Sequence, residues 1–162
     1  MAALITGVLG YFSMYRQNQA EDTRAMKERQ QVAYSALITD ERMLSQLEKD
    51  FFFMIIAKRP EVELAAQKQR VDEAHVKLSQ DVSNVALVGS APAAIIASGI
   101  ESNHLIVNSS VFIATTVADS DDFARKVADD YFNRVIAKEL DTLPFDFIQQ
   151  GRRDIGTRLT SK

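Results

Sequence analysis

The two histidines of this chain each follow an acidic residue at the same spacing. Asp72 lies three residues before His75, and Glu101 lies three residues before His104. Residues three apart share one face of a helix, so each pair can present a carboxylate and an imidazole together. The chain has no cysteine, which excludes disulfides, thiolate metal sites and cysteine nucleophiles. Chemistry at these positions must therefore use oxygen and imidazole groups.

A turn near residue 90 would bring the two pairs face to face. In an antiparallel hairpin, facing residues have a constant sum of residue numbers, and His75 with Glu101 has the same sum as Asp72 with His104. This spacing resembles one half of the arrangement in di-iron carboxylate bundles, where acid-x-x-His pairs point into the core. The resemblance implies an iron, manganese or zinc site. Its expected ligands are Asp72, His75, Glu101 and His104, with Asp40 or Glu41 and Asp130 as supporting acids.

The same residues also allow simpler interpretations. The pattern departs from that of the di-iron bundles, because an Asp replaces one Glu and the two motifs lie on consecutive helices. Two acid–histidine hydrogen bonds at a helix interface would need no metal, and a haem held by both histidines would need a wide apolar cavity. Sequence motifs for nucleotide binding, serine hydrolysis and zinc fingers are absent. The sequence therefore favours a protein that is not an enzyme.

The scarcity of backbone breakers favours long helices as the elements that carry these residues. The chain has only 6 glycines and 3 prolines in 162 residues. The breakers and short polar runs lie near residues 60, 89–92, 119–122 and 144, and short connections place helices antiparallel. We predict an all-α fold, an antiparallel four-helix bundle with an extended first helix and a short N-terminal hydrophobic anchor. The predicted segments are an anchor at 1–16, helices at 17–58, 61–88, 91–118 and 120–143, and a basic tail at 144–162.

Apolar residues recur with the heptad spacing of a bundle seam in the first three predicted helices. The third is rich in β-branched residues, so a β-hairpin over 95–117 is the alternative there. The fourth has a broad apolar face rather than a seam. The predicted core residues are Ala33, Leu37, Leu44, Leu47, Phe51 and Met54; Leu64, Val71, His75, Leu78, Val82 and Val85; Ala93, Ala97, Ile100, His104, Val107, Val111, Ala114 and Ala118; and Phe123, Val127, Tyr131, Val135 and Leu140.

The opening stretch MAALITGVLGYFSMYR carries no charged side chain before Arg16. It lacks the basic start and the small-residue cleavage site of a signal peptide, and it is shorter than the about 20 apolar residues of a full membrane span. Tyr11, Tyr15 and Arg16 could lie at the headgroup level and extend the contact with lipid. We predict a membrane anchor, and the alternative is a segment that packs in the core of an oligomer.

Basic charge is expected at the same pole as this anchor. An up-and-down bundle returns the end of its fourth helix to the side from which the first helix comes. The tail there carries Arg152 and Arg153, and the polar stretch at 16–31 lies nearby. Anionic lipid and the positive-inside rule both favour such a cluster. We therefore predict membrane contact through Tyr11, Tyr15, Arg16, Arg152 and Arg153, with the bundle on the cytoplasmic or matrix side.

The run FFFMII at 51–56 has more apolar surface than one bundle face can bury. If Phe51 and Ile55 face inward, Phe52, Phe53 and Ile56 have no assigned place. Contiguous exposed apolar patches usually mark interaction sites. We predict a partner contact through Phe51, Phe52, Phe53 and Ile56, and the alternative is burial under the turn before the fourth helix.

The charge balance limits the classes of partner. The net charge is -3, so the chain as a whole lacks the basic surface of a nucleic-acid-binding protein. We interpret the chain as a membrane-tethered bundle that acts as a non-catalytic interaction, scaffold or accessory subunit. Its expected partners are membrane lipid and either further copies of itself or the subunits of a larger complex. The alternatives are a metal-binding bundle and a ligand-sensing bundle.

Overall fold

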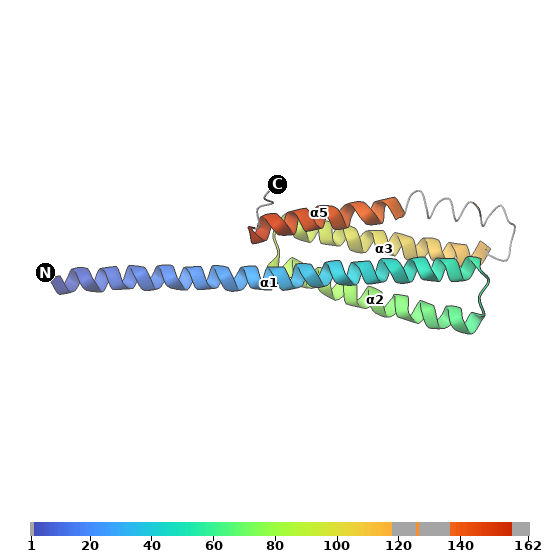
Figure 1. The fold of residues 1–162 in the computed structure, drawn as a ribbon, viewed down its shortest axis with the longest axis horizontal. Helices are drawn as coiled ribbons and strands as arrows, with labels where there is room; N and C mark the ends of the chain where they lie inside the picture. Colours follow the sequence, from blue (N-terminus) through green and yellow to red (C-terminus); the bar gives the residue numbers. More distant parts are fainter. Residues whose placement is uncertain (1, 118–125, 127–136, 157–162) are drawn as a thin grey trace, which may run out of the picture.

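The computed structural model describes the backbone of residues 2–117, 126 and 137–156, and side chains within 17–109, at 126 and within 142–156. The helices in these ranges are α1 (Ala2–Ile56), α2 (Glu61–Val88), α3 (Ala91–Val117) and α5 (Ala137–Ile155). They pack lengthwise against one another, and α1 extends far beyond the other three (Figure 1). The described part of the chain contains no strand, so the predicted all-α antiparallel bundle is confirmed and the hairpin alternative over 95–117 is wrong.

The core follows the predicted heptad seams of the first three helices. Leu37 and Leu44 of α1, Leu78 of α2 and Val107 of α3 are all 0% exposed. Burial of such side chains is the main favourable contribution to folding, about 1.5–3 kcal/mol for each. The expected core positions from Val111 to Leu140 lie outside the described side chains. The remaining buried apolar residues of the core are Ala33, Tyr34, Phe51, Phe52, Ile55, Val71, Ala74, Val82, Val85, Ala93, Ala97, Ile100 and Phe147.

The breaks between the first three helices lie where proline and glycine predict them. Pro60, with φ −53 and ψ 143, precedes α2, whose first turn carries Glu61 and Glu63 at the positive end of the helix dipole. Gly89 ends α2, and there a Cβ atom would lie 2.6 Å from the Val85 carbonyl oxygen. Glycine is therefore required at this turn because of a close approach, and its φ of −80 is ordinary.

The fourth described helix does not end where the sequence predicted. We expected a helix end at 143 and a separate tail at 144–162, but α5 continues through Pro144 to Ile155. Leu143, Phe147 and Ile155 recur on one face and pack against the core, and Phe147 is only 1% exposed. A proline inside a helix costs about 3 kcal/mol, which the packing of this face offsets. The expected helix start near 120 lies outside the described residues.

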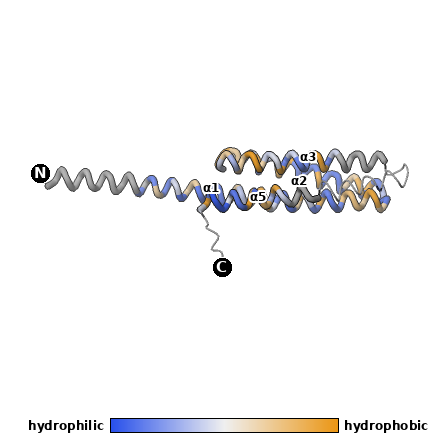
Figure 2. Tube along the Cα trace, turned by 90° about the horizontal axis from the view of Figure 1, so that it is seen from above, coloured by the Kyte–Doolittle hydropathy of each residue, from blue (hydrophilic) through white to orange (hydrophobic). Residues whose placement is uncertain are grey.

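The N-terminal part of α1 forms a stalk outside the bundle. Its described side chains from Gln17 to Arg29 are all exposed, and Gln30 makes the first hydrogen bond to the bundle, from Nε2 to the Val88 carbonyl oxygen at 2.9 Å. Figure 2 shows this described section as largely hydrophilic where it leaves the bundle. The part of α1 before residue 30 spans about 40 Å at 1.5 Å per residue. The stalk therefore holds the bundle well away from residue 2.

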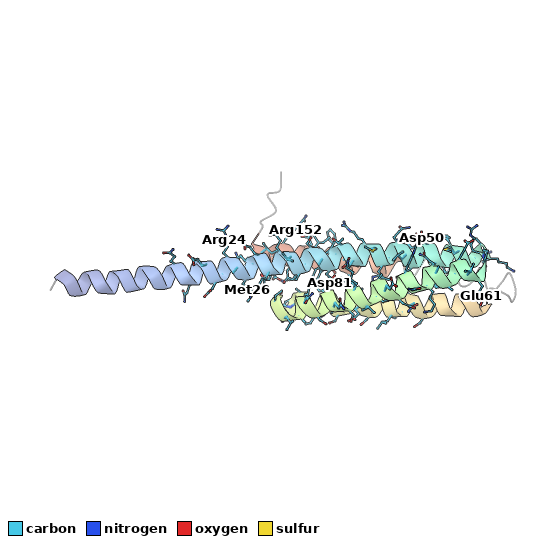
Figure 3. The ribbon with its side chains drawn as sticks, turned by 90° about the horizontal axis from the view of Figure 1, so that it is seen from below. Arg24, Met26, Asp50, Glu61, Asp81 and Arg152 are labelled. Atoms are coloured by element: carbon cyan, nitrogen blue, oxygen red, sulfur yellow. The ribbon has the colours of Figure 1, made fainter. Side chains whose placement is uncertain are left out.

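The end of α5 lies at the pole from which the stalk projects. Figure 3 shows Arg152 of α5 close to the level of Arg24 and Met26 on α1. Arg152 and Arg153 occupy the last turn of α5 and are exposed. Among the described helices, none combines the length and the apolar character that a membrane crossing needs.

Candidate functional site

The most unusual feature of the core is a carboxylate that lies between two imidazoles. Glu48 of α1 is 1% exposed, and its Oε2 lies 2.8 Å from Nδ1 of His104 on α3, which is 0% exposed. Its other oxygen, Oε1, lies 3.1 Å from Nε2 of His75 on α2. The two imidazole rings stand nearly perpendicular, with centroids 6.1 Å apart. We call Glu48, His75 and His104 the central cluster.

A second buried acid lies next to the central cluster on the same side of α1. Glu41 is 3% exposed, and its Oε1 lies 3.9 Å from Nε2 of His104 and accepts a hydrogen bond from the Ser45 hydroxyl at 2.9 Å. Glu41 and Glu48 are seven residues apart, in line with the buried side chains of Tyr34 and Ile55. Two turns of α1 therefore aim both carboxylates into the core, where each faces His104.

The central cluster has polar atoms left without an aligned hydrogen-bond partner. These atoms are Glu48 Oε1, His75 Nε2 and His104 Nε2. Oε1 and Nε2 of the Glu48–His75 pair are 3.1 Å apart but poorly aligned for a hydrogen bond. Buried charges cost several kcal/mol each to desolvate, and removing one partner of such a group leaves the others uncompensated. The central cluster therefore holds α1, α2 and α3 in one register.

The structure brings together the two predicted histidines but not their predicted acids. Asp72 forms an ion pair with Lys68 at 2.5 Å, with both side chains about half exposed, and Glu101 is half-buried. In the described part of the chain, no three His, Asp or Glu side chains are arranged to hold a metal ion. The acids that face the histidines come from α1, because that helix packs against both α2 and α3.

One predicted supporting acid, Asp40, belongs to a separate cluster on the α1–α2 face. Asp40 is 5% exposed and its Oδ1 accepts a hydrogen bond from Nζ of Lys77 at 2.8 Å. Asp81, one turn beyond Lys77 on α2 and 8% exposed, hydrogen bonds to Asp40 through its proton when it is protonated. The other predicted supporting acid, Asp130, lies outside the described residues. We call Asp40, Lys77 and Asp81 the acidic cluster.

The acidic cluster titrates close to neutral pH. Burial, the hydrogen bond with Asp40 and the charge of Asp40 raise the pKa of Asp81 to about 6. Burial also acts to raise the pKa of Asp40, but hydrogen bonds with Lys77 and Asp81 outweigh it and lower that pKa. The same hydrogen bond and the Asp40 charge raise the pKa of Lys77. The cluster therefore gains a negative charge as the pH rises through about 6.

A third polar group joins α1, the α2–α3 turn and α5 at the stalk end of the bundle. The Tyr34 hydroxyl donates to Oδ2 of Asp154 at 2.6 Å and accepts from the Ser90 amide at 3.2 Å. The Ser90 hydroxyl also donates to Asp154, at 2.8 Å. Gly151 lies directly beneath the ring, because a Cβ there would be 2.8 Å from Cδ2 of Tyr34. We call Tyr34, Ser90 and Asp154 the polar junction.

The residues predicted to contact a partner or a membrane differ in how exposed they are. Phe51 and Phe52 are buried, Ile56 is half-buried and only Phe53, at 57%, is exposed, so these residues form no contiguous exposed patch. We expected an exposed patch because only one face of α1 was assigned to the core. At this end of α1, side chains on more than one face of the helix are buried. The side chains of Tyr11, Tyr15 and Arg16 lie outside the described part, and Arg152 and Arg153 are exposed at the stalk end.

Sequence reasoning missed Glu48 and placed Glu41 only as a supporting acid. The signal was present, since both glutamates lie in the heptad line of Tyr34 and Ile55. Comparisons of this chain with protein-family models, with curated proteins and with solved structures found no match.

Proposed function

We propose that this chain is a non-catalytic interaction or accessory module, a four-helix bundle that a helical stalk tethers to a membrane. The observation that carries the proposal is the continuity of α1, which runs from Ala2 to Ile56 and leaves the bundle before Gln30. An isolated helix that is polar on all sides is marginal in water, so a stalk of this kind needs support at its far end. The apolar stretch at 1–16 supplies the group that a lipid surface would take up.

The charge at the stalk end supports the same arrangement. Arg152 and Arg153 lie exposed on the last turn of α5, and Lys27 lies exposed on the stalk. Each Lys or Arg near an anionic lipid surface contributes about 1 kcal/mol to binding. These residues would then add electrostatic attraction to the apolar contact of the anchor, which alone is short for a full span.

Flotation of the full chain with anionic lipid vesicles tests the tether. We expect the chain to float with the vesicles, and Val8→Asp with Leu9→Asp to abolish flotation while the circular dichroism stays helical. Arg152→Gln with Arg153→Gln should weaken flotation and increase its sensitivity to salt. Recovery of the wild-type chain only in the lipid-free fraction would overturn the tether.

Native mass spectrometry tests the interaction part of the proposal. The full chain, purified with and without detergent, should carry defined further subunits, either copies of itself or other proteins. Bound metal would be detected in the same spectra, and its loss in His104→Ala would favour the metal-binding alternative. A chain that is monomeric and metal-free in both conditions would contradict the accessory-subunit proposal.

A further inference from the structure

A groove between α1 and α2 has an acidic end and an apolar end. The acidic end, about 720 Å³, is lined by Ser35, Ala36 and Thr39 of α1 together with the acidic cluster. A second hollow of about 480 Å³ continues it and shares Glu28, Val32 and Ala36 with it. Pockets for small ligands have volumes of about 300–1,000 Å³. The groove therefore has the size of a small-molecule site, and Figure 3 shows Asp81 where the two helices meet.

The acidic cluster has fewer cations than carboxyls. Asp40 has its own ammonium partner, because it accepts from Nζ of Lys77, whose side chain is 58% exposed. Asp81 lines the groove, is 8% exposed, and its Oδ2 has no hydrogen-bond partner. Asn84 hydrogen bonds to the same carboxyl but brings no charge. A buried carboxylate without a cation is costly, and this burial, together with Asp40, raises the pKa of Asp81 to about 6.

The other charged groups at the groove do not supply a cation for Asp81. Glu28 lines the groove from α1 and forms an ion pair with Arg24 at 3.1 Å, with both side chains mostly exposed. Arg29 lines the apolar end rather than the acidic end. The described lining comes from α1 and α2 alone, so Glu28, Asp40 and Lys77 are the charged groups that share the acidic end with Asp81.

The neighbouring surface is apolar and exposed. Val32 is 71% exposed and Leu87 is 81% exposed, and Ala33, Ala36 and Val88 also line this end, beside the polar side chains of Glu28, Arg29 and Asn84. The alanine, serine and threonine side chains of α1 are small, so they leave space on this side of the groove. A ligand that fits would therefore pair a cationic head with a short apolar body.

We propose that this groove binds a small primary ammonium compound, with its N–H groups on Asp81 and Asp40 and its apolar part over Val32 and Ala36. The Lys77–Asp40 pair is an internal example of the same contact, an ammonium nitrogen 2.8 Å from a carboxylate oxygen. An ammonium ion supplies three donors and a full charge, and it takes the place of the Asp81 proton when the carboxyl turns toward the groove. The proposal goes beyond the tethered-module function and does not depend on it.

Binding should depend on pH because the ligand competes with that proton. Asp81, with its pKa at about 6, is mostly ionised at about pH 7.5 and mostly protonated at about pH 5. The apparent affinity is reduced by the fraction of sites in the competent state, so it should be about tenfold weaker at about pH 5. Proton release on binding should be measurable near pH 6 by calorimetry in buffers of different ionisation enthalpy.

The test is a titration of the full chain with n-butylammonium, followed by two-dimensional NMR of the backbone amides. We expect saturable shifts confined to residues 25–40 and 77–88, about tenfold weaker binding at about pH 5, and no saturation with the neutral analogue n-butanol. Asp81→Asn should abolish the pH dependence and weaken binding at least about tenfold, whereas Asp50→Asn, on the exposed side of α1, should change neither.

A second variant keeps the test informative whatever Asp81→Asn does to folding. Lys77→Met removes the internal ammonium, so it should tighten the binding of n-butylammonium at about pH 7.5. Three results would each overturn the proposal. These are no saturable binding, equal binding of n-butanol, or unchanged binding in both Asp81→Asn and Lys77→Met.

Discussion

The central cluster and the acidic cluster each contain one acid of α1, Glu48 and Asp40, about two helical turns apart. The groups that surround these two acids differ. Glu48, in the centre, is 1% exposed and has two imidazoles against it from two other helices. Asp40, eight residues earlier, accepts a hydrogen bond from Lys77 of α2 and also hydrogen bonds to Asp81. The centre is therefore closed by three helices, whereas the acidic cluster borders a groove and changes charge near neutral pH.

This difference indicates separate roles for the two clusters. A closed cluster in which each member depends on the others opposes any shift of α1 against α2 and α3. A cluster at a groove can exchange a proton or a cation with solvent without unfolding the bundle. We therefore expect the central cluster to matter for stability through its pairing and packing, and the acidic cluster to matter through its pH dependence.

The largest effect should follow removal of the central carboxylate. Glu48→Ala leaves a cavity and removes the partner of both imidazoles, so we expect the free energy of unfolding to fall by about 3–5 kcal/mol. Urea denaturation at about pH 7 measures it. Asp50→Ala is the matched control two residues along α1, since Asp50 is exposed and bonds only to Gln46, and it should change stability by less than about 0.5 kcal/mol.

Apolar replacement of the whole central cluster separates pairing from packing. Glu48→Met with His75→Leu and His104→Leu should retain the wild-type stability or exceed it, because well-packed apolar groups avoid the desolvation cost. A triple variant as unstable as Glu48→Ala would instead mean that the pairing of these side chains, and not their volume, decides the stability of the centre.

The acidic cluster should show a smaller effect that changes with pH. Because the folded protein raises the pKa of Asp81 from 3.8 to about 6, it binds more protons than the unfolded chain in this window, and stability falls as the pH rises through it. Asp81→Asn removes this loss and keeps a donor for Asp40. We expect the variant to be more stable than the wild type by about 1–3 kcal/mol at about pH 7.5 and nearly equal at about pH 4.

Thermal melts at these two pH values check the sign of the effect. The melting temperature of Asp81→Asn should exceed that of the wild type by about 5 °C at about pH 7.5. Asp50→Asn removes a carboxylate from the same pair of helices without touching the acidic cluster, so its melts should follow those of the wild type at both pH values. A constant difference between wild type and Asp81→Asn across the pH range would contradict the raised pKa of Asp81.

The sequence predicted the first three helices well because their ends depend on local chemistry. Pro60 and Gly89 stop helices through backbone geometry, and heptad spacing alone assigns Leu37, Leu44 and Leu78 to the core. The end of α5 was predicted wrongly because we expected Pro144 to end the helix. The packing of Phe147 against the core, which depends on the whole bundle, overrides that local preference.

For a related reason, the sequence predicted the two histidines of the candidate site but not the acids that face them. Antiparallel pairing of α2 and α3 places His75 and His104 side by side, and that follows from the short turn between the helices. Their acids could not be assigned from the same hairpin, because the partner of both histidines is α1. Acids are nearly always solvated in amphipathic helices, so the sequence offered no reason to place Glu48 in the core, although it lies in the heptad line of Tyr34 and Ile55.

The polar junction is a third polar group to compare with the two clusters. It is partly buried, and its Tyr34 hydroxyl does not change its protonation at physiological pH. Burial and the hydrogen bond to Asp154 raise the pKa of Tyr34 to about 12, so its hydroxyl remains protonated across the working range. Tyr34→Phe keeps the edge-to-face contact with Phe147, at 5.2 Å between ring centroids, and removes the charge-assisted hydrogen bond to Asp154 and the longer one from the Ser90 amide. Asp154 keeps its bonds from Ser90 and Gln150, so we expect a loss of about 1–1.5 kcal/mol. That loss should be the same at about pH 5 and about pH 9 in urea titrations, and a loss that grows with pH would place this junction with the acidic cluster instead.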